Sequence, residues 1–282
     1  MSDIQKLTGF IGAELSGVDL TPPVSPALSE MLNAALGEHG VLVIRGQHLD
    51  LDRQRAVTQA FGPVMRLPYV AGLADDADVI AVLKEADEGN SGVFGGAWHS
   101  DFSFLENPPA GSVLNAVEIP PYGGDTVWAC QVAAYASLPA HLKDFLAGHD
   151  AIHVGKPYGV KYAPPEKERA NSAIRMTRGD PEADRETVHP SVVTDPATGR
   201  RALFLNPIYT TRFDGLTEEE SAPFLEQIYK HCTRPDFSYR HRWQAGDLLV
   251  WDNRMTLHYA TNDYAGFRRL LYRTTFSGAR PV

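Results

Sequence analysis

Apolar positions at helical spacing predict three helices along the chain. Residues 25–40 form the first, because Ser25 suits an N-cap and Pro26 suits the first helical turn. Residues 51–61 form the second, which a Gly-Pro pair then ends. Residues 217–232 form the third, because Thr217 and the glutamate three positions later have the spacing of a capping box. Helices therefore account for a small part of the chain.

Short β-branched or alternating runs predict more strands than helices. The run 41–44 is apolar throughout, which is typical of a buried strand. The predicted strands cover residues 41–44, 79–83, 111–119, 126–129, 237–242, 247–251 and 267–276. Many short strands with few helices favour a mainly β fold with flanking helices, a β-sandwich or jelly roll, over a doubly wound sheet.

Neither a repeat nor a sharp linker divides the sequence, so residues 1–282 are predicted to form a single domain. Residues 85–97 are polar and rich in glycine, and residues 161–187 are dense in proline and charge with little apolar periodicity. Loops of this length in a compact domain are usually lids, binding loops or disordered excursions. We interpret 85–97 as a lid and 161–187 as an excursion; the alternative for 85–97 is an exposed loop without function.

The composition is that of a globular protein, and its charge narrows the classes of partner. Of the 282 residues, 43% are hydrophobic and 22% are charged. The net charge of -9 repels phosphate backbones and anionic lipids, which argues against nucleic-acid and membrane partners. Two cysteines without metal-type spacing fit a reducing compartment. Without a signal-like or membrane-spanning apolar run, the chain is predicted to be cytoplasmic.

The triplet His99-Ser100-Asp101 is the first candidate for metal chemistry. A second His-x-Asp triplet ends in Asp50 at the start of a predicted helix, where a carboxylate is better explained as a cap. Context separates the two, because residues 98–104 alternate between polar and aromatic side chains. We interpret that segment as a strand with His99, Asp101 and Ser103 on one face, where two of them can bind one ion.

A third ligand is needed, and His258 is the best candidate because it follows one predicted strand and precedes another. Two histidines and one carboxylate form the facial triad of non-haem iron(II) oxygenases, which leaves three metal positions open. Taken alone, a histidine beside Tyr259 is more often a hydrogen-bonded core or surface residue.

The last predicted strand places Arg269 and Arg273 on one face, with Arg268 on the other. Two inward guanidinium groups are costly unless anions satisfy them. A guanidinium binds a carboxylate through two parallel hydrogen bonds, so these arginines suit a dicarboxylate beside a metal. The alternative is an internal salt bridge to an acidic residue of the chain.

Taken together, the motifs resemble those of the iron(II)- and 2-oxoglutarate-dependent dioxygenases of the taurine dioxygenase group, the TauD/TfdA family. The resemblance covers nearly the whole chain. It rests on Gly12-Ala13-Glu14, residues 40–47, Trp98-His99-Ser100-Asp101, Pro108-Pro109-Ala110-Gly111, Gly123-Gly124-Asp125-Thr126, His189-Pro190, Thr198-Gly199-Arg200, Trp251-Asp252-Asn253-Arg254 and His258-Tyr259-Ala260. The fold that it implies is a double-stranded β-helix, a jelly roll.

The resemblance also implies a ligand set and a reaction. His99, Asp101 and His258 would bind Fe(II), while Thr126 and Arg269 would hold the far carboxylate of 2-oxoglutarate. Arg273 would lie beside this co-substrate and meet the anionic group of the primary substrate. The implied reaction consumes O2, converts 2-oxoglutarate to succinate and CO2, and hydroxylates an aliphatic C–H of a small molecule.

The substrate is less well defined by the sequence. Taurine dioxygenase itself remains an alternative, but Val70 and Gly95 stand where the taurine enzymes have polar side chains. Aromatic and apolar candidates for the pocket are Tyr69, Val70, Phe94, Phe102 and Tyr209, although each aromatic could instead be plain core. We therefore expect a fairly apolar anion: a sulfonate, an alkyl sulfate or a carboxylic acid. An alternative of another class is a cupin-like protein that binds metal without redox turnover. The oligomeric state stays open, with a homodimer or homotetramer as candidates.

Overall fold

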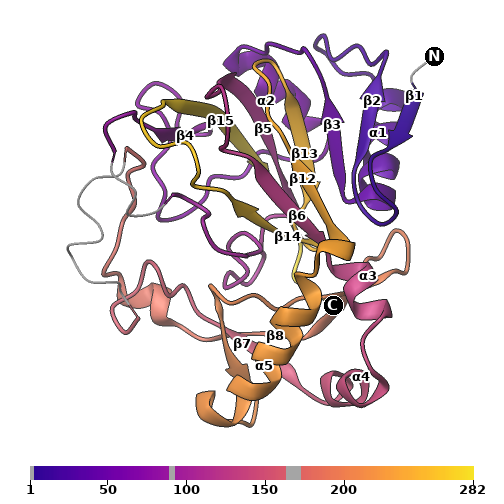
Figure 1. The fold of residues 1–282 in the computed structure, drawn as a ribbon, viewed down its shortest axis with the longest axis vertical. Helices are drawn as coiled ribbons and strands as arrows, with labels where there is room; N and C mark the ends of the chain where they lie inside the picture. Colours follow the sequence, from indigo (N-terminus) through magenta and orange to yellow (C-terminus); the bar gives the residue numbers. More distant parts are fainter. Residues whose placement is uncertain (1–2, 89–92, 163–172) are drawn as a thin grey trace.

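Two layers of β-sheet and a set of flanking helices make up the structure, a computed structural model that describes residues 3–88, 93–162 and 173–282 (Figure 1). The α-helices are α1 Pro26–His39, α2 Leu51–Gln59, α3 Gln131–Ala136, α4 Ala140–Ala147 and α5 Glu218–Cys232. Two short 3-10 helices are η2 Pro181–Asp184 and η3 Pro235–Phe237. None of the helices in these three ranges is long and apolar enough to cross a bilayer.

The strands are grouped in four sheets, of which a seven-stranded one is the largest. Its order is β1-β2-β3-β13-β5-β15-β4. The strands of the chain are β1 Asp3–Lys6, β2 Ala13–Ser16, β3 Val41–Ile44, β4 Ile80–Lys84, β5 Gly111–Glu118, β6 Thr126–Cys130, β7 Asp150–His153, β8 Thr187–Pro190, β9 Val192–Thr194, β10 Arg201–Leu203, β11 Thr210–Phe213, β12 Ser238–His241, β13 Leu248–Asp252, β14 Thr256–Ala260 and β15 Arg269–Phe276.

The centre of the seven-stranded sheet is buried on both faces, which explains why β13 is apolar along most of its length. Leu248 and Val250 pack on one face in a cluster with residues of α1 and α2. Leu249 and Trp251 pack on the other face with side chains of the three-stranded sheet β12-β6-β14. Successive side chains of a strand point to opposite faces, so one run of apolar residues serves both cores.

The three-stranded sheet β12-β6-β14 closes the second layer of the jelly roll. Trp128 of β6 is fully buried, and its ring centroid lies 6.0 Å from that of Trp251 of β13. Helices α3, α4 and α5 gather with β7 and β8 at the end of the molecule away from α1 (Figure 1). The metal-ligand candidates described below lie between the two layers, on β14 and on the segment that precedes β5.

Most of the predicted elements are confirmed. The helices over 25–40, 51–61 and 217–232 correspond to α1, α2 and α5, and Thr217 and Glu220 form the predicted capping box. Every predicted strand from 41–44 to 267–276 also has its counterpart. The sequence reasoning missed β1, β2, α3, α4, β14 and all five strands between residues 150 and 213, which are short and carry little periodicity.

The strand predicted over residues 98–104 is wrong. His99 makes only an isolated bridge, and residues 101–104 form a turn in which Phe102 has a φ of 49°. Alternation was a misleading signal here, because a tight turn also sends neighbouring side chains in different directions. Of the predicted lid and excursion, residues 89–92 and 163–172 lie outside the described part of the chain. Within the excursion, the described residues include η2 and the start of β8.

Candidate functional site

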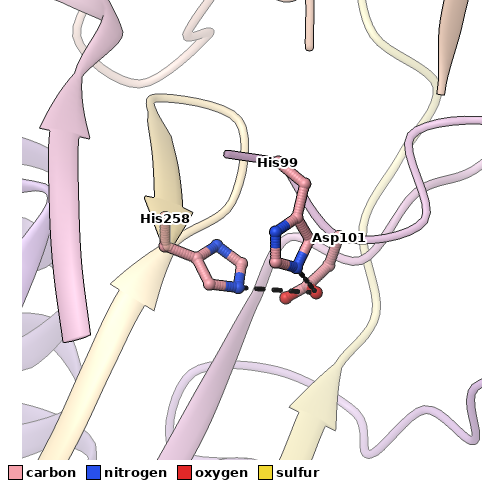
Figure 2. A group of neighbouring side chains, drawn as sticks. All are labelled: His99, Asp101 and His258. Atoms are coloured by element: carbon pink, nitrogen blue, oxygen red, sulfur yellow. Dashed lines mark ion pairs between the residues drawn. The ribbon is translucent and has the colours of Figure 1, made fainter. Parts of the chain in front are cut away.

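Backbone pairing brings His99 and His258 face to face, although they lie far apart in sequence. The amide of His99 donates to the carbonyl of His258 at 3.0 Å, and the amide of His258 donates back at 2.8 Å. The two imidazole centroids are 4.1 Å apart. Gly95 lies in the same segment with a φ of 77°, and a Cβ there would lie 3.3 Å from the His99 ring. Figure 2 shows the two rings directed toward Asp101.

Asn253 fixes the turn that carries Asp101. Its Oδ1 accepts from the Asp101 amide at 2.7 Å, and its Nδ2 donates to the Asp101 carbonyl at 2.9 Å and to the Pro109 carbonyl at 3.0 Å. The Ser100 hydroxyl donates to the Asn253 carbonyl at 2.6 Å. The turn therefore replaces the predicted strand and still directs Asp101 toward both histidines.

His99, Asp101 and His258 form a compact set of donor atoms. One nitrogen or oxygen from each lies within 4.8 Å of the others, and all three residues are buried. Asp101 Oδ1 is 3.5 Å from His99 Nε2 and 3.7 Å from His258 Nε2. The other ring nitrogen of His99, Nδ1, is 2.8 Å from the Ala97 carbonyl, so it carries the proton and leaves Nε2 as a lone-pair donor.

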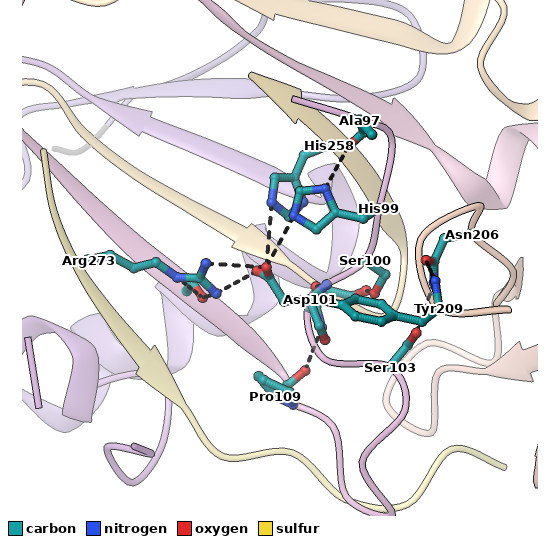
Figure 3. Close-up of polar contacts among 12 residues, drawn as sticks. Ala97, His99, Ser100, Asp101, Ser103, Pro109, Asn206, Tyr209, His258 and Arg273 are labelled. Atoms are coloured by element: carbon teal, nitrogen blue, oxygen red, sulfur yellow. Dashed lines mark hydrogen bonds and ion pairs between the residues drawn. The ribbon is translucent and has the colours of Figure 1, made fainter. Parts of the chain in front are cut away.

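Arg273 pairs with both carboxylate oxygens of Asp101, and its Nη1 donates to Oδ1 at 3.2 Å (Figure 3). Its Nη2 donates to Asp101 Oδ2 at 2.6 Å and to the Ser112 hydroxyl at 2.9 Å. Burial alone would raise the pKa of Asp101, but Arg273 and the two histidines outweigh it and hold that pKa well below its usual range. Burial and His99 lower the pKa of His258. At neutral pH Asp101 is therefore a carboxylate and His258 a neutral imidazole, the protonation states that bind metal.

Arg269 is also buried, with 4% of its surface exposed. Its Nε donates to the Gly124 carbonyl at 3.0 Å, and no carboxylate in the described part of the chain forms an ion pair with it. Burial lowers its pKa to about 10, which still leaves it charged at neutral pH. The guanidinium carbon lies 5.9 Å from the ring of Trp243, whose Nε1 donates to the Thr126 hydroxyl at 3.0 Å. Trp243 thus lies between the two predicted co-substrate residues.

A cavity of about 450 Å³ opens directly onto the triad. His99 and Asp101 line it together with three of the predicted substrate residues, Phe94, Phe102 and Tyr209. Further apolar wall comes from Val93, Pro157, Tyr158, Met176 and Ile208. Arg178 is the one lysine or arginine among the described residues that line the cavity.

Three other residues predicted for substrate lie outside the lining of this cavity. Val70 packs in the apolar cluster behind Phe102. Tyr69 stacks on Tyr158 with ring centroids 5.0 Å apart and lines a different cavity. Arg273 is 3% exposed and lies behind Asp101, against Ser112. In this structure Arg273 therefore forms an internal salt bridge, and its acidic partner is Asp101. An internal salt bridge was the alternative to binding a dicarboxylate.

A second hydrogen-bond network supports the cavity wall from behind. Asn206 donates through Nδ2 to the Ser103 hydroxyl at 2.8 Å, and its Oδ1 accepts from the Tyr209 amide at 2.9 Å (Figure 3). The Ser103 hydroxyl is also 3.0 Å from His153 Nδ1. Ser103, predicted to share a face with the ligands, instead belongs to this network. Asn206 and Asn253 were not singled out as functional, because single asparagines carry no periodic signal.

A larger cavity, of about 670 Å³, lies elsewhere, beside Phe10 and Phe237. No group of three metal-ligating side chains other than the triad occurs in the described ranges. We therefore place the functional site at the smaller cavity, where donor atoms and an enclosed apolar volume coincide. The triplet at 48–50 is separate: Asp50 caps α2 by accepting from the Arg53 amide at 2.8 Å, as predicted.

Comparison with known proteins adds independent findings. The sequence model described as "Taurine catabolism dioxygenase TauD, TfdA family" matches residues 3–275. The chain is 35% identical to an alkylsulfatase of Acinetobacter baylyi, with 98% of this chain and 84% of that protein covered. It is 36% identical to an alpha-ketoglutarate-dependent sulfate ester dioxygenase of Pseudomonas putida, with 99% and 91% covered. A crystal structure of a putative alpha-ketoglutarate-dependent taurine dioxygenase from Burkholderia xenovorans superposes with a TM-score of 0.82 at 34% identity, covering 100% of this chain and 94% of that one.

Proposed function

Because this chain belongs to the TauD/TfdA family and is a 2-oxoglutarate-dependent dioxygenase, we propose that it hydroxylates an aliphatic C–H of a small, fairly apolar anion. The observation that carries the proposal is the His99, Asp101 and His258 set facing an apolar cavity. Succinate and CO2 are the co-products. Family membership also excludes the cupin-like alternative without redox turnover.

His99, Asp101 and His258 are the proposed ligands of Fe(II). Two imidazole nitrogens and one carboxylate oxygen within 4.8 Å of one another fit the facial triad. When bound, the iron supplies activation of O2 at the expense of 2-oxoglutarate. The protein's part is to hold the donors in place: Ala97 accepts from His99, and Arg273 donates to both oxygens of Asp101.

Thr126 and Arg269 are the proposed binding residues for the distal carboxylate of 2-oxoglutarate. A buried guanidinium without a carboxylate partner needs an anion, because a solitary buried charge is costly. Arg273 belongs to the same face of β15, four positions further along, and lies next to Asp101. We propose that it borders both the co-substrate and the anionic group of the primary substrate.

The cavity supports an alkyl sulfate, sulfonate or carboxylic acid as the substrate. Phe94, Phe102 and Tyr209 provide apolar surface for a hydrocarbon part, and Arg178 provides a positive charge at the wall. The relatives named for sulfate esters agree with an anion of this kind. Taurine is the second candidate, but the cavity lining includes no carboxylate besides Asp101 among the described residues to receive its ammonium group.

A screen of succinate release tests the proposal. Enzyme loaded anaerobically with Fe(II) is mixed with 2-oxoglutarate, O2 and one compound from a series of linear alkyl sulfates, alkyl sulfonates, aryloxyacetates and taurine. We expect alkyl sulfates to raise succinate release well above the background without substrate, and taurine to leave it near background. Stimulation by taurine alone would support the second candidate, and no stimulation by any anion would reject the substrate class.

The remaining sequence predictions stay proposals. Residues 1–282 are proposed to act as one domain, with 85–97 closing over the substrate. Both cysteines are free and buried, which supports a cytoplasmic location. Size-exclusion chromatography with light scattering would test whether the protein is a monomer, a dimer or a tetramer.

A further inference from the structure

Lys84 and Arg269 form an unusual pair of buried cations. Lys84 ends β4 and lies directly opposite Arg269 of β15 in the antiparallel register. Directly opposite residues of neighbouring strands project from the same face of the sheet. Each has only 4% of its surface exposed. Like charges in this arrangement repel, so the pair is costly unless an anion lies close to both.

No acid in the described ranges forms an ion pair with either cation. Lys84 Nζ donates to the neutral Asn262 Oδ1 at 2.8 Å, and Arg269 Nε donates to a backbone carbonyl. Glu88 lines the same small cavity, but its Oε1 accepts from the amides of Glu85 and Ala173. The two positive charges thus lack the direct carboxylate partner that buried cations normally have.

Tyr264 connects the two cations. Its ring centroid lies 4.6 Å from Lys84 Nζ and 5.9 Å from the guanidinium carbon of Arg269. The side chain is 1% exposed, and its hydroxyl has no hydrogen-bond partner among the described residues. A buried hydroxyl without a partner costs free energy that a bound acceptor would recover.

All three residues line one small cavity of about 20 Å³, and Phe94 lines both this cavity and the one in front of the triad. A space of this size holds about one water-sized group, so at most the end of a ligand reaches it. Two cations, one free hydroxyl and one carboxylate, that of Glu88, surround it, and Glu88 Oε1 is already engaged by two amides. The two cations and the hydroxyl favour an anionic end with oxygen acceptors. The distal carboxylate of the co-substrate, already assigned to Arg269, has this chemistry.

We propose that Lys84 is a second cation of the co-substrate pocket and that its charge, with the Tyr264 hydroxyl, adds to Arg269 in binding the distal carboxylate of 2-oxoglutarate. This inference rests on the proposed function. Lys84 is a positioning residue that acts on the carboxylate by charge and through Tyr264. Lys84 thereby raises the affinity for dianionic 2-oxo acids and leaves the affinity for monoanionic ones unchanged.

Isothermal titration with Mn(II)-loaded protein tests the inference without turnover. The ligands are 2-oxoglutarate and 2-oxobutyrate, which lacks the distal carboxylate. We expect Lys84→Met to weaken 2-oxoglutarate binding on the order of tenfold, because a unit charge acts strongly over a short distance in a buried pocket. The affinity for 2-oxobutyrate stays within about twofold, and Lys84→Arg restores most of the 2-oxoglutarate affinity.

Arg268→Met is the matched control, because it removes one positive charge from the adjacent position on the opposite face, where Arg268 pairs with Glu85 and Glu118. It should leave both affinities unchanged. Tyr264→Phe, which preserves the packing, should weaken 2-oxoglutarate binding severalfold and spare 2-oxobutyrate, so the inference is testable even where Lys84→Met does not fold. Unchanged 2-oxoglutarate affinity in these variants, or equal weakening of both ligands, would overturn it. Wild-type protein that binds neither ligand would instead reject the proposed function.

Discussion

The metal end and the substrate end of this active site are built in different ways. At the metal end, backbone hydrogen bonds and buried polar side chains fix each group: His258 lies inside β14, His99 pairs with its backbone, and Asn253 fixes Asp101. At the substrate end, the wall comes from loops and from stacked rings, such as Phe102 on Tyr158 with centroids 5.5 Å apart.

This difference separates chemistry from specificity. A buried hydrogen-bonded network fails when one member is removed, because its partners stay buried and unsatisfied. An apolar wall loses area and changes shape gradually with side-chain size. We therefore expect substitutions at the metal end to abolish turnover and substitutions at the substrate end to change which compounds react. The predictions below test that contrast.

Asp101→Asn should have the largest effect. It removes the only carboxylate of the triad and leaves Arg273 buried without its partner, a change that typically costs about 3–5 kcal/mol of unfolding free energy. We expect loss of bound Fe(II) and of substrate-dependent succinate release by more than roughly a thousandfold. Metal analysis and urea unfolding measure the two effects. Asp50→Asn is the control from the other His-x-Asp triplet, where asparagine still caps α2; retained metal in Asp101→Asn would contradict the ligand assignment.

Asn253→Ala should weaken metal binding about 10–100-fold while leaving all three ligands present. The reason is that Asn253 makes three hydrogen bonds to the Asp101 and Pro109 backbone. Competition with a chelator of known affinity measures the loss. Asn33→Ala removes an exposed asparagine from α1 and serves as the control. Wild-type metal affinity in Asn253→Ala would show that the turn holds its shape without this clamp.

The sequence located the metal end better than the substrate end, for physical reasons. Taken together, a His-x-Asp triplet, a distant histidine and two inward arginines indicate metal and anion chemistry that folding alone does not need. The reasoning still erred locally, since it made residues 98–104 a strand and placed His258 after a strand rather than in β14. The turn depends on Asn253, which is remote in sequence, and no local pattern encodes that contact.

The substrate cavity was only partly predictable. Phe94, Phe102 and Tyr209 were expected and line it, whereas Tyr158, Met176 and Ile208 were not singled out. These three come from segments without apolar periodicity. Tyr158 and Ile208 meet because β7 and β11 pair and place their adjoining loops together, whereas Met176 is held by an isolated bridge to Val70. Arg178 was missed for the same reason. Contacts between irregular segments depend on the whole fold, so a single sequence gives them little signal.

Phe102→Ala should change specificity while sparing the metal. The side chain is 1% exposed and packs on Tyr158, Phe104 and Tyr209, so truncation costs about 3–5 kcal/mol of stability. We expect the KM of an apolar anionic substrate to rise on the order of tenfold, because lost apolar contact in a pocket has that magnitude. Bound Fe(II) and the co-substrate KM should stay as in the wild type. Loss of metal in this variant would show that the two ends are not separable.

Arg178→Gln should have the smallest effect, confined to the charge of the substrate. Arg178 is only partly buried, so solvent screens its field, and its Nη1 donates to the Pro157 carbonyl at 2.7 Å. We expect the KM of an alkyl sulfate to rise severalfold and to lose part of its dependence on salt, with the co-substrate KM unchanged. Arg185→Gln, an exposed arginine from the same segment, is the control. An equal rise in the KM of the alkyl sulfate and in the KM of the co-substrate would show that Arg178 affects the cavity as a whole. An unchanged KM for the alkyl sulfate would leave Arg273 as the charge that meets the substrate.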